Sequence, residues 1–313
     1  MTPAPIRIGT RGSPLALAQA ALVRDALRLS RPELGREGAV EIVPIRTSGD
    51  RIQDRRLVEA GGKGLFTKEI EEALIEGRID LAVHSMKDMP TWLPDGLTVA
   101  ALLPREDPRD ALFSNGARRL DELPQGAVVG TSSLRRQAQV LMARRDLQVV
   151  PLRGNVETRL RKLAEGAVDA TLLAVAGLKR LGLAHRLQAV LEPEEMLPAV
   201  AQGAIGVETR IDDDRTMDLV RDLDHPATRL RITAERALLA GLDGSCRTPI
   251  AALAELDETG ATLRLRSLIA LPDGSAAHRD DRRGPAADAE AIGRAAALAL
   301  KSMAGPEFFR ALG

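Results

Sequence analysis

The 313-residue sequence has few aromatic residues and a single cysteine. It contains no tyrosine, four phenylalanines and one tryptophan, which are too few aromatic faces for a protein that stacks single-stranded bases. Cys246 has no second cysteine to pair with, so a disulfide-stabilised secreted scaffold is excluded. No apolar run is long enough to predict a transmembrane helix, and residues 1–8 lack the features of a signal peptide. We therefore expect a cytoplasmic protein that has no membrane partner.

An excess of charge of one sign is also absent, because 44 basic residues balance 44 acidic ones. This balance predicts no overall attraction to nucleic acid or to a membrane surface. Apolar residues make up 44% of the chain, which is enough to build sizeable cores. Only six of the basic residues are lysines, so the positions of the arginines are the more informative feature.

Short apolar runs alternate with amphipathic stretches over the first two-thirds of the chain. Strands are expected at 6–9, 39–45, 80–83, 97–103, 127–130, 147–152 and 170–173, and helices at 14–29, 68–76, 134–143, 156–165 and 175–181. This alternation predicts two α/β domains, each built on a largely parallel sheet. Two prolines within 103–108 indicate a hinge between the domains, and 193–202 indicates a second crossover.

The pattern changes after residue 226. A helix is expected at 227–240, a loop at 241–249, strands at 250–256, 262–270 and 275–282, and an alanine-rich helix at 286–303. Strands followed by one helix predict a small α+β domain. We therefore expect a first domain at 1–103, completed by about 203–222, a second at 109–197 and a third at 226–313.

Three strand-to-helix junctions combine hydroxyl or amide side chains with arginine. They are residues 10–14, 131–136 and 153–159. Each places Ser, Thr or Asn where a helix N-cap belongs and Arg in or beside the first turn. A cation there opposes the helix dipole, so the pattern favours a bound anion at the carboxyl ends of the strands. Solvated helix faces are the alternative, and the better one for Arg144, Arg145 and Arg161.

The strand expected at 80–83 leads into a run of polar side chains. Ser85, Lys87 and Asp88 supply a hydroxyl, an ammonium and a carboxylate in succession. A carboxylate near cationic groups can act as an acid or base, or stabilise a cationic intermediate. A Lys–Asp pair that caps a turn before Pro90 is the alternative. We interpret His84 as a core histidine with a satisfied hydrogen bond.

Two loops bounded by glycine carry single reactive groups. Residues 61–66 contain Lys63 without the spacing of a phosphate-binding loop, and we interpret them as a mobile lid anchored by Phe66. Cys246 lies beside Arg247, and a neighbouring cation favours the thiolate. An attachment site, a nucleophile and an inert small apolar residue all remain open for this cysteine. No cluster has metal-ligand spacing, so no metal is expected.

Taken in order, these segments resemble the hydroxymethylbilane synthase family, whose members are also called porphobilinogen deaminases. The matching segments are 8–16, 61–66, 83–90, 105–110, 130–136, 152–155, 173–183, 197–203 and 244–249. They cover essentially the whole chain in the same order and spacing. The resemblance implies an α/β fold with two domains of the type II periplasmic-binding-protein kind and a smaller C-terminal α+β domain.

The resemblance also implies a transferase of porphyrin and haem biosynthesis. Such an enzyme condenses four porphobilinogen molecules into hydroxymethylbilane with release of ammonia. It implies a monomer with a dipyrromethane cofactor attached to Cys246 through a thioether, and Asp88 as the catalytic carboxylate. The expected cofactor-binding residues are Ser85, Lys87, Thr131, Ser132, Ser133, Arg135, Arg136 and Arg159; the substrate-binding residues are Arg11, Ser13, Arg153 and Arg180; and the lid residues are Lys63 and Phe66.

Two other functions stay open from the residues alone. A binding protein or sensor for a polycarboxylate or an oxyanion needs the same arginines and hinge, but gives no role to Asp88 or Cys246. A nucleic-acid-binding protein would use the arginines on phosphates, which the zero net charge and the five aromatic residues disfavour.

Overall fold

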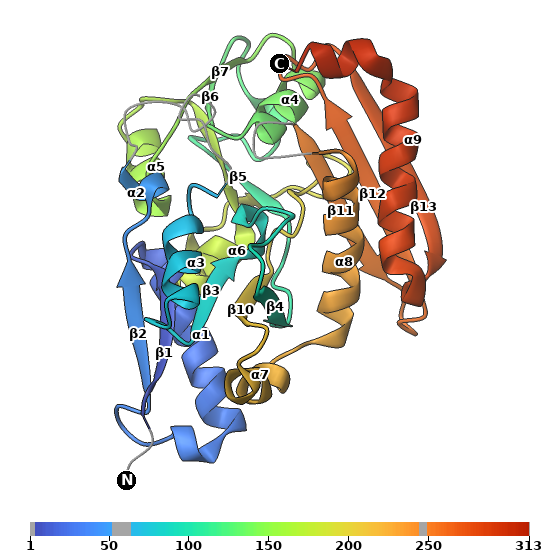
Figure 1. Ribbon diagram of the computed structural model, residues 1–313. Coiled ribbons are helices and arrows are strands. Elements are labelled where there is room, and N and C mark those ends of the chain that lie inside the picture. Colours follow the sequence, from blue (N-terminus) through green and yellow to red (C-terminus); the bar gives the residue numbers. More distant parts are fainter. Residues whose placement is uncertain (1–3, 52–63, 244–248, 313) are drawn as a thin grey trace. The chain divides into compact units, whose positions relative to one another are not determined.

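The computed structural model describes residues 4–51, 64–243 and 249–312 (Figure 1). Contacts between residues divide the chain into two compact units. Unit 1 consists of Met1–Glu106 with Ala204–Arg229, and unit 2 consists of Asp107–Gly203 with Leu230–Gly313. The chain therefore passes from unit 1 to unit 2 after residue 106, returns to unit 1 at residue 204, and enters unit 2 again at residue 230.

Unit 1 is built on a five-stranded sheet with the order β2-β1-β3-β10-β4. Its strands are β1 (Ile6–Arg11), β2 (Val40–Ile45), β3 (Leu81–Ser85), β4 (Leu97–Leu102) and β10 (Ile205–Arg210), and its helices are α1 (Pro14–Ser30), α2 (Ser48–Arg51), α3 (Lys68–Ile75) and α7 (Asp214–Arg221). β1 pairs in parallel with β2 and β3, whereas β10 is antiparallel to both β3 and β4. Four strands thus share one direction and β10 runs against them.

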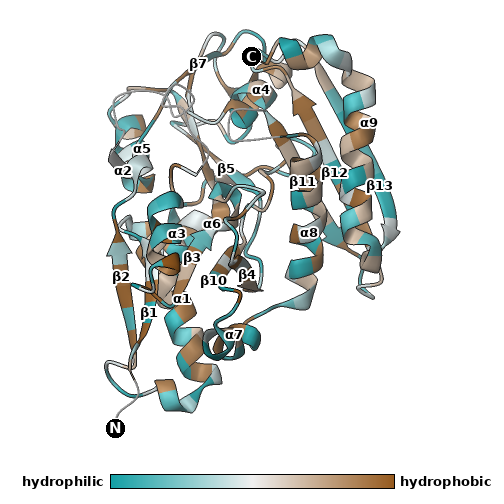
Figure 2. Cartoon of the chain, in the orientation of Figure 1, coloured by the Kyte–Doolittle hydropathy of each residue, from teal (hydrophilic) through white to brown (hydrophobic). Residues whose placement is uncertain are grey.

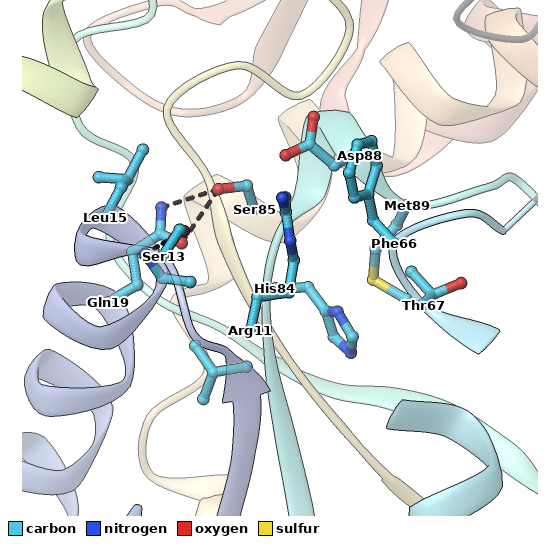
Figure 3. A pocket seen from close by; sticks show the side chains of 12 residues that line it. Arg11, Ser13, Leu15, Gln19, Phe66, Thr67, His84, Ser85, Asp88 and Met89 are labelled. Carbon is cyan, nitrogen blue, oxygen red and sulfur yellow. Dashed lines mark hydrogen bonds between the residues drawn. The ribbon is translucent and has the colours of Figure 1, made fainter. Parts of the chain in front are cut away.

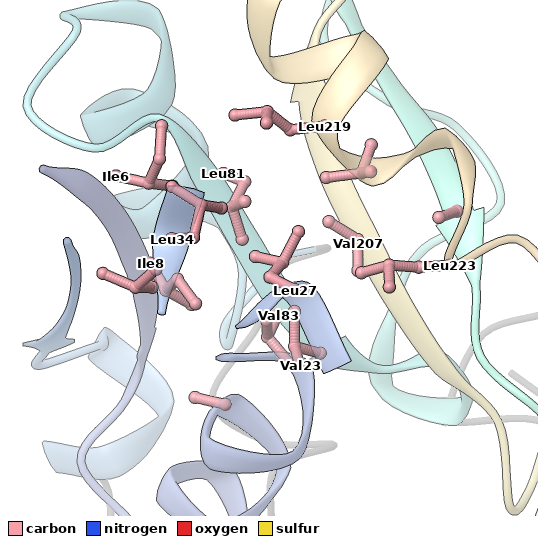
Figure 4. Close-up of a cluster of buried hydrophobic side chains, with 14 of the residues drawn as sticks. Ile6, Ile8, Val23, Leu27, Leu34, Leu81, Val83, Val207, Leu219 and Leu223 are labelled. Atoms are coloured by element: carbon pink, nitrogen blue, oxygen red, sulfur yellow. The ribbon is translucent and has the colours of Figure 1, made fainter. Parts of the chain in front are cut away.

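Two helices cover opposite faces of this sheet. α1 begins where Ser13 accepts a hydrogen bond from the Ala16 backbone N–H at 3.3 Å and Pro14 occupies the first helical position. Its apolar stripe, including Val23 and Leu27, packs against one face of the sheet (Figure 4). α3 packs on the other face, where Ile70, Ala73 and Leu74 join Ala82 of β3.

Unit 2 repeats this plan with a sheet of order β7-β6-β8-β5-β9. Its strands are β5 (Asp110–Ser114), β6 (Val128–Gly130), β7 (Gln148–Val150), β8 (Ala170–Ala174) and β9 (Ala189–Val190), and its helices are α4 (Leu134–Ala143), α5 (Val156–Ala164) and α6 (Val175–Arg180). β6 pairs in parallel with β7 and β8, and β5 is antiparallel to β8 and β9. Each sheet therefore receives its antiparallel strand directly after the chain has crossed between the units.

The C-terminal part adds a three-stranded antiparallel sheet. It consists of β11 (Ile250–Leu256), β12 (Thr262–Ala270) and β13 (Ala277–Pro285), with α8 (Pro226–Gly241) and α9 (Ala289–Arg310). Figure 2 shows the contrast between the mainly apolar β11 and the hydrophilic β13. α8 and α9 approach closely at Gly293, where a Cβ atom would lie 2.2 Å from the Ala234 carbonyl oxygen. Only glycine fits this approach without a shift of the backbone.

The predicted fold class is confirmed, and the predicted strands and helices are present with small differences at their ends. The predictions did not include the strands β5, β9 and β10 or the helices α2 and α7. The predicted third domain, 226–313, shares most of its length with unit 2, so the division into three domains stays a prediction. Within the described segments, no helix is long and apolar enough to cross a membrane.

Candidate functional site

A pocket of about 50 Å³ lies in unit 1 where β1 and β3 end (Figure 3). It is lined by Arg11, Ser13, Leu15, Ala16, Gln19, Phe66, Thr67, Val83, His84, Ser85, Asp88 and Met89. β1 and β3 are parallel neighbours, so their carboxyl ends meet at one edge of the sheet. Ligands of open α/β sheets bind at this edge. The fold thus brings five predicted site residues of unit 1 together: Arg11, Ser13, Phe66, Ser85 and Asp88.

The pocket presents one cation and one carboxylate. The guanidinium carbon of Arg11, at the end of β1, lies 4.0 Å from the centre of the Phe66 ring, which is a cation–π contact. Asp88 ends the short 3-10 turn Met86–Asp88 that follows β3. Figure 3 shows Arg11, Phe66 and Asp88 around the same space. Phe66 precedes α3, so this cation–π contact connects the end of β1 with the segment that leads into α3.

Ser85 is held by a residue that the sequence reasoning missed. The Gln19 side chain donates Nε2–H to the Ser85 Oγ at 2.8 Å, and the Ser85 hydroxyl lies 3.0 Å from Gln19 Oε1. Gln19 lies on α1 and is 2% exposed. The available signal was a glutamine on the apolar stripe of a helix, between Ala16 and Ala20. A buried polar side chain at such a position needs a hydrogen-bond partner.

His84 fits the interpretation of a core histidine. Its Nε2 lies 2.9 Å from Oε2 of Glu208, and both side chains are buried. A third buried group, the Glu71 carboxyl, has a raised pKa because of its burial and because of the negative charge of Glu208. Neither glutamate was among the predicted site residues, since nothing in the local sequence shows that they are buried.

In unit 2, the predicted N-caps are present at two neighbouring helices. Ser133 accepts a hydrogen bond from the Arg136 N–H at 3.4 Å at the start of α4, and Asn155 accepts one from the Thr158 N–H at 2.8 Å at the start of α5. The Thr131 Oγ1 accepts a hydrogen bond from the Ser133 N–H at 3.1 Å, and the Ser132 hydroxyl donates to the Leu152 carbonyl oxygen at 3.2 Å. The hydroxyls of Thr131, Ser132 and Ser133 therefore stabilise the backbone of these junctions.

Arg135 and Arg136 both donate hydrogen bonds to the same buried carboxylate, that of Asp110 at the start of β5. Their Nη2 atoms donate to the two Asp110 oxygens at 2.7 and 2.8 Å, and all three side chains are buried. Burial alone would raise the pKa of Asp110, but the charges of Arg135 and Arg136 outweigh it and hold the pKa well below its usual range. Both arginines therefore have a structural role that the sequence did not indicate, and their role toward a ligand stays a prediction.

A second arginine cluster lies around the start of α5. The Arg159 Nε–H donates to the Gly154 carbonyl oxygen at 2.9 Å. Burial lowers the pKa of Arg159 to about 10, with further contributions from the positive charges of Arg136 and Arg153. Like charges held this close favour an anion between them, because the anion relieves their repulsion. Two adjacent helix N-termini add to that preference.

The remaining predicted residues fall outside these two groups or outside the described chain. Lys87 lies in the turn before Asp88, and the Arg180 Nη2 donates to the Gly203 carbonyl oxygen at 2.6 Å. Lys63 and Cys246 lie outside the described residues, so their positions stay predictions. In the part of the chain that the structure describes, no group of three or more His, Cys, Asp or Glu side chains could hold a metal ion.

Two models of known protein families match this chain, and the first of them includes both groups of site residues. The profile described as "Porphobilinogen deaminase, dipyromethane cofactor binding domain" matches residues 6–218, and "Porphobilinogen deaminase, C-terminal domain" matches residues 229–302. The chain belongs to the porphobilinogen deaminase family. The predicted family is thereby confirmed, together with the predicted enzyme class and the role in tetrapyrrole biosynthesis.

Curated members of the family match along nearly the whole chain. The chain is 56% identical to "Porphobilinogen deaminase, chloroplastic" of Oryza sativa subsp. japonica, over 98% of this chain and 86% of that protein. It is 57% identical to "Porphobilinogen deaminase" of Paracoccus denitrificans (strain Pd 1222), over 97% of this chain and 96% of that protein. Solved structures with weaker similarity include a periplasmic substrate-binding protein from Coxiella burnetii, with a TM-score of 0.42 and 18% identity over 72% of this chain and 94% of that one.

Proposed function

We propose that this chain condenses four porphobilinogen molecules stepwise into hydroxymethylbilane and releases ammonia at each step. The observation that carries the proposal is the unit 1 pocket, where Asp88 and Arg11 face the same space inside the matched family domain. Porphobilinogen bears acetate and propionate groups and an amine that leaves. A site for it needs cations for the carboxylates and an anion for the charge that develops on the ring. The pocket supplies both.

Asp88 is the proposed catalytic carboxylate. Loss of the amine as ammonia leaves a positively charged pyrrole ring, whose N–H becomes a stronger hydrogen-bond donor. A carboxylate that accepts this hydrogen bond stabilises the charge more in the transition state than in the bound substrate, which is the condition for catalysis. Asp88 lies in a short turn directly after β3, the central strand of the sheet, so the position of this strand fixes where the turn begins.

Arg11 and Ser13 are the proposed substrate-binding residues of unit 1, with Arg153 and Arg180 in unit 2. A guanidinium group binds a carboxylate through two parallel N–H donors, and this bidentate contact fixes the orientation of the bound group. The Phe66 ring limits the movement of the Arg11 guanidinium. The proposed roles of Lys63 and Phe66 as lid residues stay predictions.

The donor set of unit 2 fits a polycarboxylate cofactor. Arg135 and Arg136 each keep a buried Nε–H for which no hydrogen-bond partner is found among the described residues. Their Nη2 atoms donate to Asp110 and their Nη1 atoms to backbone carbonyls. Arg159 adds a third cation, which its surroundings disfavour unless an anion is bound. We infer that these arginines, with Thr131, Ser132 and Ser133, hold the carboxylates of a dipyrromethane. The cofactor-binding roles of Ser85 and Lys87 in unit 1 stay predictions.

When bound, the dipyrromethane supplies the pyrrole terminus to which the first substrate is joined. We propose Cys246 as its attachment point, through a thioether, because this is the only cysteine of the chain. The monomeric state that the family resemblance implies and the cytoplasmic location expected from the sequence both stay predictions.

The test is turnover of porphobilinogen by the purified protein, with loss of substrate, release of ammonia and formation of the linear tetrapyrrole measured together. We expect four substrates and four ammonia molecules per tetrapyrrole. Asp88→Asn keeps the size of the side chain and removes the charge, so it should lower kcat by about 100-fold or more. Asp95→Asn, at an exposed aspartate of the same unit, is the matched control and should behave as wild type. Binding of porphobilinogen without turnover would support a polycarboxylate-binding protein instead.

A further inference from the structure

Three buried titratable side chains lie behind the pocket of unit 1, and the proposed function uses none of them. They are His84 on β3, Glu208 on β10 and Glu71 on α3, with 6%, 0% and 6% of their surfaces exposed. His84 also lines the pocket, so the cluster reaches from the site into the core. Buried carboxyl groups are costly unless they are paired or protonated, so a pair of them calls for an explanation.

The strand register places this cluster on one face of the sheet. β10 is antiparallel to β3, with Gly206 opposite His84 and Glu208 opposite Ala82, so the His84 and Glu208 side chains point to the same side. The distance of 2.9 Å between His84 Nε2 and Glu208 Oε2 requires one proton between these two atoms. α3 covers this face through Ile70, Ala73 and Leu74. Its buried Glu71 interacts electrostatically with both His84 and Glu208.

The surroundings of Glu71 favour its protonated form. One oxygen of Glu71 and one of Glu208 are buried and lack a hydrogen-bond partner in the described segments. Burial raises the pKa of the Glu71 carboxyl, and the negative charge of Glu208 adds to this effect. The other charged groups near the cluster are Glu72, which is exposed on α3, and Arg11 and Asp88 on the pocket side.

The segment that begins at His84 carries the functional groups of the pocket. Ser85 follows directly and is bound by Gln19 of α1, on the opposite face of the sheet. The Met86 N–H donates to the Ala204 carbonyl oxygen at 3.0 Å, just before β10 begins. The end of β3 is therefore held on one face by Gln19 and on the other by Glu208. This clamp sets the direction in which the next turn presents Asp88.

We propose that the buried side chains of His84, Glu208 and Glu71 form a triad that positions residues 85–88 for the reaction. The inference rests on the proposed function for the reaction itself. His84 and Glu208 are positioning residues, since they act through the end of β3. Glu71 is the third member, and in its protonated form it places no second negative charge beside the His84–Glu208 pair.

Glutamine substitutions separate the two glutamates because glutamine has the shape of a protonated glutamate. Glu208→Gln removes the charged partner of His84 and should lower kcat by about 10-fold or more, with KM changed by less than about 3-fold. Glu71→Gln replaces a protonated acid with a neutral amide, so its kcat should stay at least about 5-fold above that of Glu208→Gln. Glu72→Gln, at the exposed neighbour on α3, is the matched control and should retain wild-type turnover.

A second measurement does not depend on activity or on a bound cofactor. A carboxyl group whose pKa is raised on folding binds more protons in the folded state, so its contribution to stability is lost as pH rises above about 4.5, the usual pKa of a glutamate. Glu71→Gln removes this loss. The melting temperature of Glu71→Gln minus that of wild type should therefore increase as pH rises from about 4 to 8, whereas the same difference for Glu72→Gln should stay constant.

The two measurements give distinct outcomes. A larger loss of kcat in Glu208→Gln than in Glu71→Gln, with a pH-dependent difference in melting temperature for Glu71→Gln, supports the triad. Equal losses of kcat in both variants, or a difference that does not change with pH, overturns it. If Glu208→Gln does not fold, the pH dependence of the melting temperature of Glu71→Gln relative to wild type is the remaining test: a difference that increases with pH supports the triad, and a constant difference overturns it. A wild-type protein that does not consume porphobilinogen would refute the proposed function, while the melting temperatures would still test the triad.

Discussion

Asp110→Asn should destabilise unit 2 strongly, because it removes the only charge that Arg135 and Arg136 share. The carboxylate is fully buried and accepts hydrogen bonds from both guanidinium groups and from the Gln202 side chain, at 2.7, 2.8 and 2.9 Å. Asparagine has nearly the same volume, so packing is preserved. The substitution replaces one acceptor oxygen with an amide group that donates, and it leaves two buried cations next to each other.

The magnitude follows from the cost of unpaired buried charge. Breaking a buried ion pair by removing one partner costs about 3–5 kcal/mol. Here the lost anion serves two cations, but each arginine also donates to a backbone carbonyl, Arg135 to Leu197 and Arg136 to Leu172. These bonds remain in the variant, so the loss should stay near that range. At about 2–4 °C per kcal/mol, the melting temperature should fall by roughly 10 °C.

The assay is thermal unfolding at several pH values, followed by circular dichroism. The two arginines lower the pKa of Asp110 on folding, so its contribution to stability is present above the usual aspartate pKa of about 3.8 and is lost as pH falls below it. The difference in melting temperature between wild type and Asp110→Asn should therefore be largest near pH 7 and should decrease below about pH 4. Asp25→Asn, in an exposed pair with Arg24, is the control and should melt like wild type. An Asp110→Asn variant as stable as this control would refute the reasoning.

Three further outcomes concern the α5 junction and the pocket. Asn155→Ala removes the N-cap of α5 and should cost about 1 kcal/mol in urea unfolding. Gly154→Ala should cost about 1–3 kcal/mol, because Gly154 has φ of +120° and a Cβ there would lie 2.6 Å from the Thr158 Cγ2. Gln19→Leu should lower kcat with porphobilinogen several-fold by releasing Ser85, while a wild-type kcat would remove Gln19 from the site.

Elements whose signals are local could be predicted from the sequence. The start of α1 depends on Ser13 and Pro14, and α4 begins after Ser133, which caps it; both helices lie where these residues indicate. The strand ends that carry Arg11 and Asp88 were also predicted, because an apolar run followed by polar residues shows where a buried strand stops. In the structure, these two residues line one pocket because β1 and β3 are parallel neighbours.

Features that depend on partners distant in the sequence could not be predicted. β10 contains Glu208, which is buried only because His84, 124 positions earlier, bonds to it. β5 begins with Asp110, which is buried because Arg135 and Arg136 neutralise it. β10 interrupts its apolar residues with a glycine and a glutamate, and β5 has only three apolar residues in a row, so the apolar pattern of each strand is short. The same long-range pairing gives the two arginines a role in the core that their position in a helix N-terminal turn does not indicate.

The mass of the intact protein tests the central claim most directly. The protein is purified from a host that makes porphobilinogen, and the Cys246→Ser variant is purified in parallel. We predict a wild-type mass that exceeds the sequence mass by one dipyrromethane unit, located on the peptide that contains Cys246, and an unmodified Cys246→Ser variant. A wild-type protein with the mass of its bare sequence, or a pyrrole unit on another residue, would contradict the account.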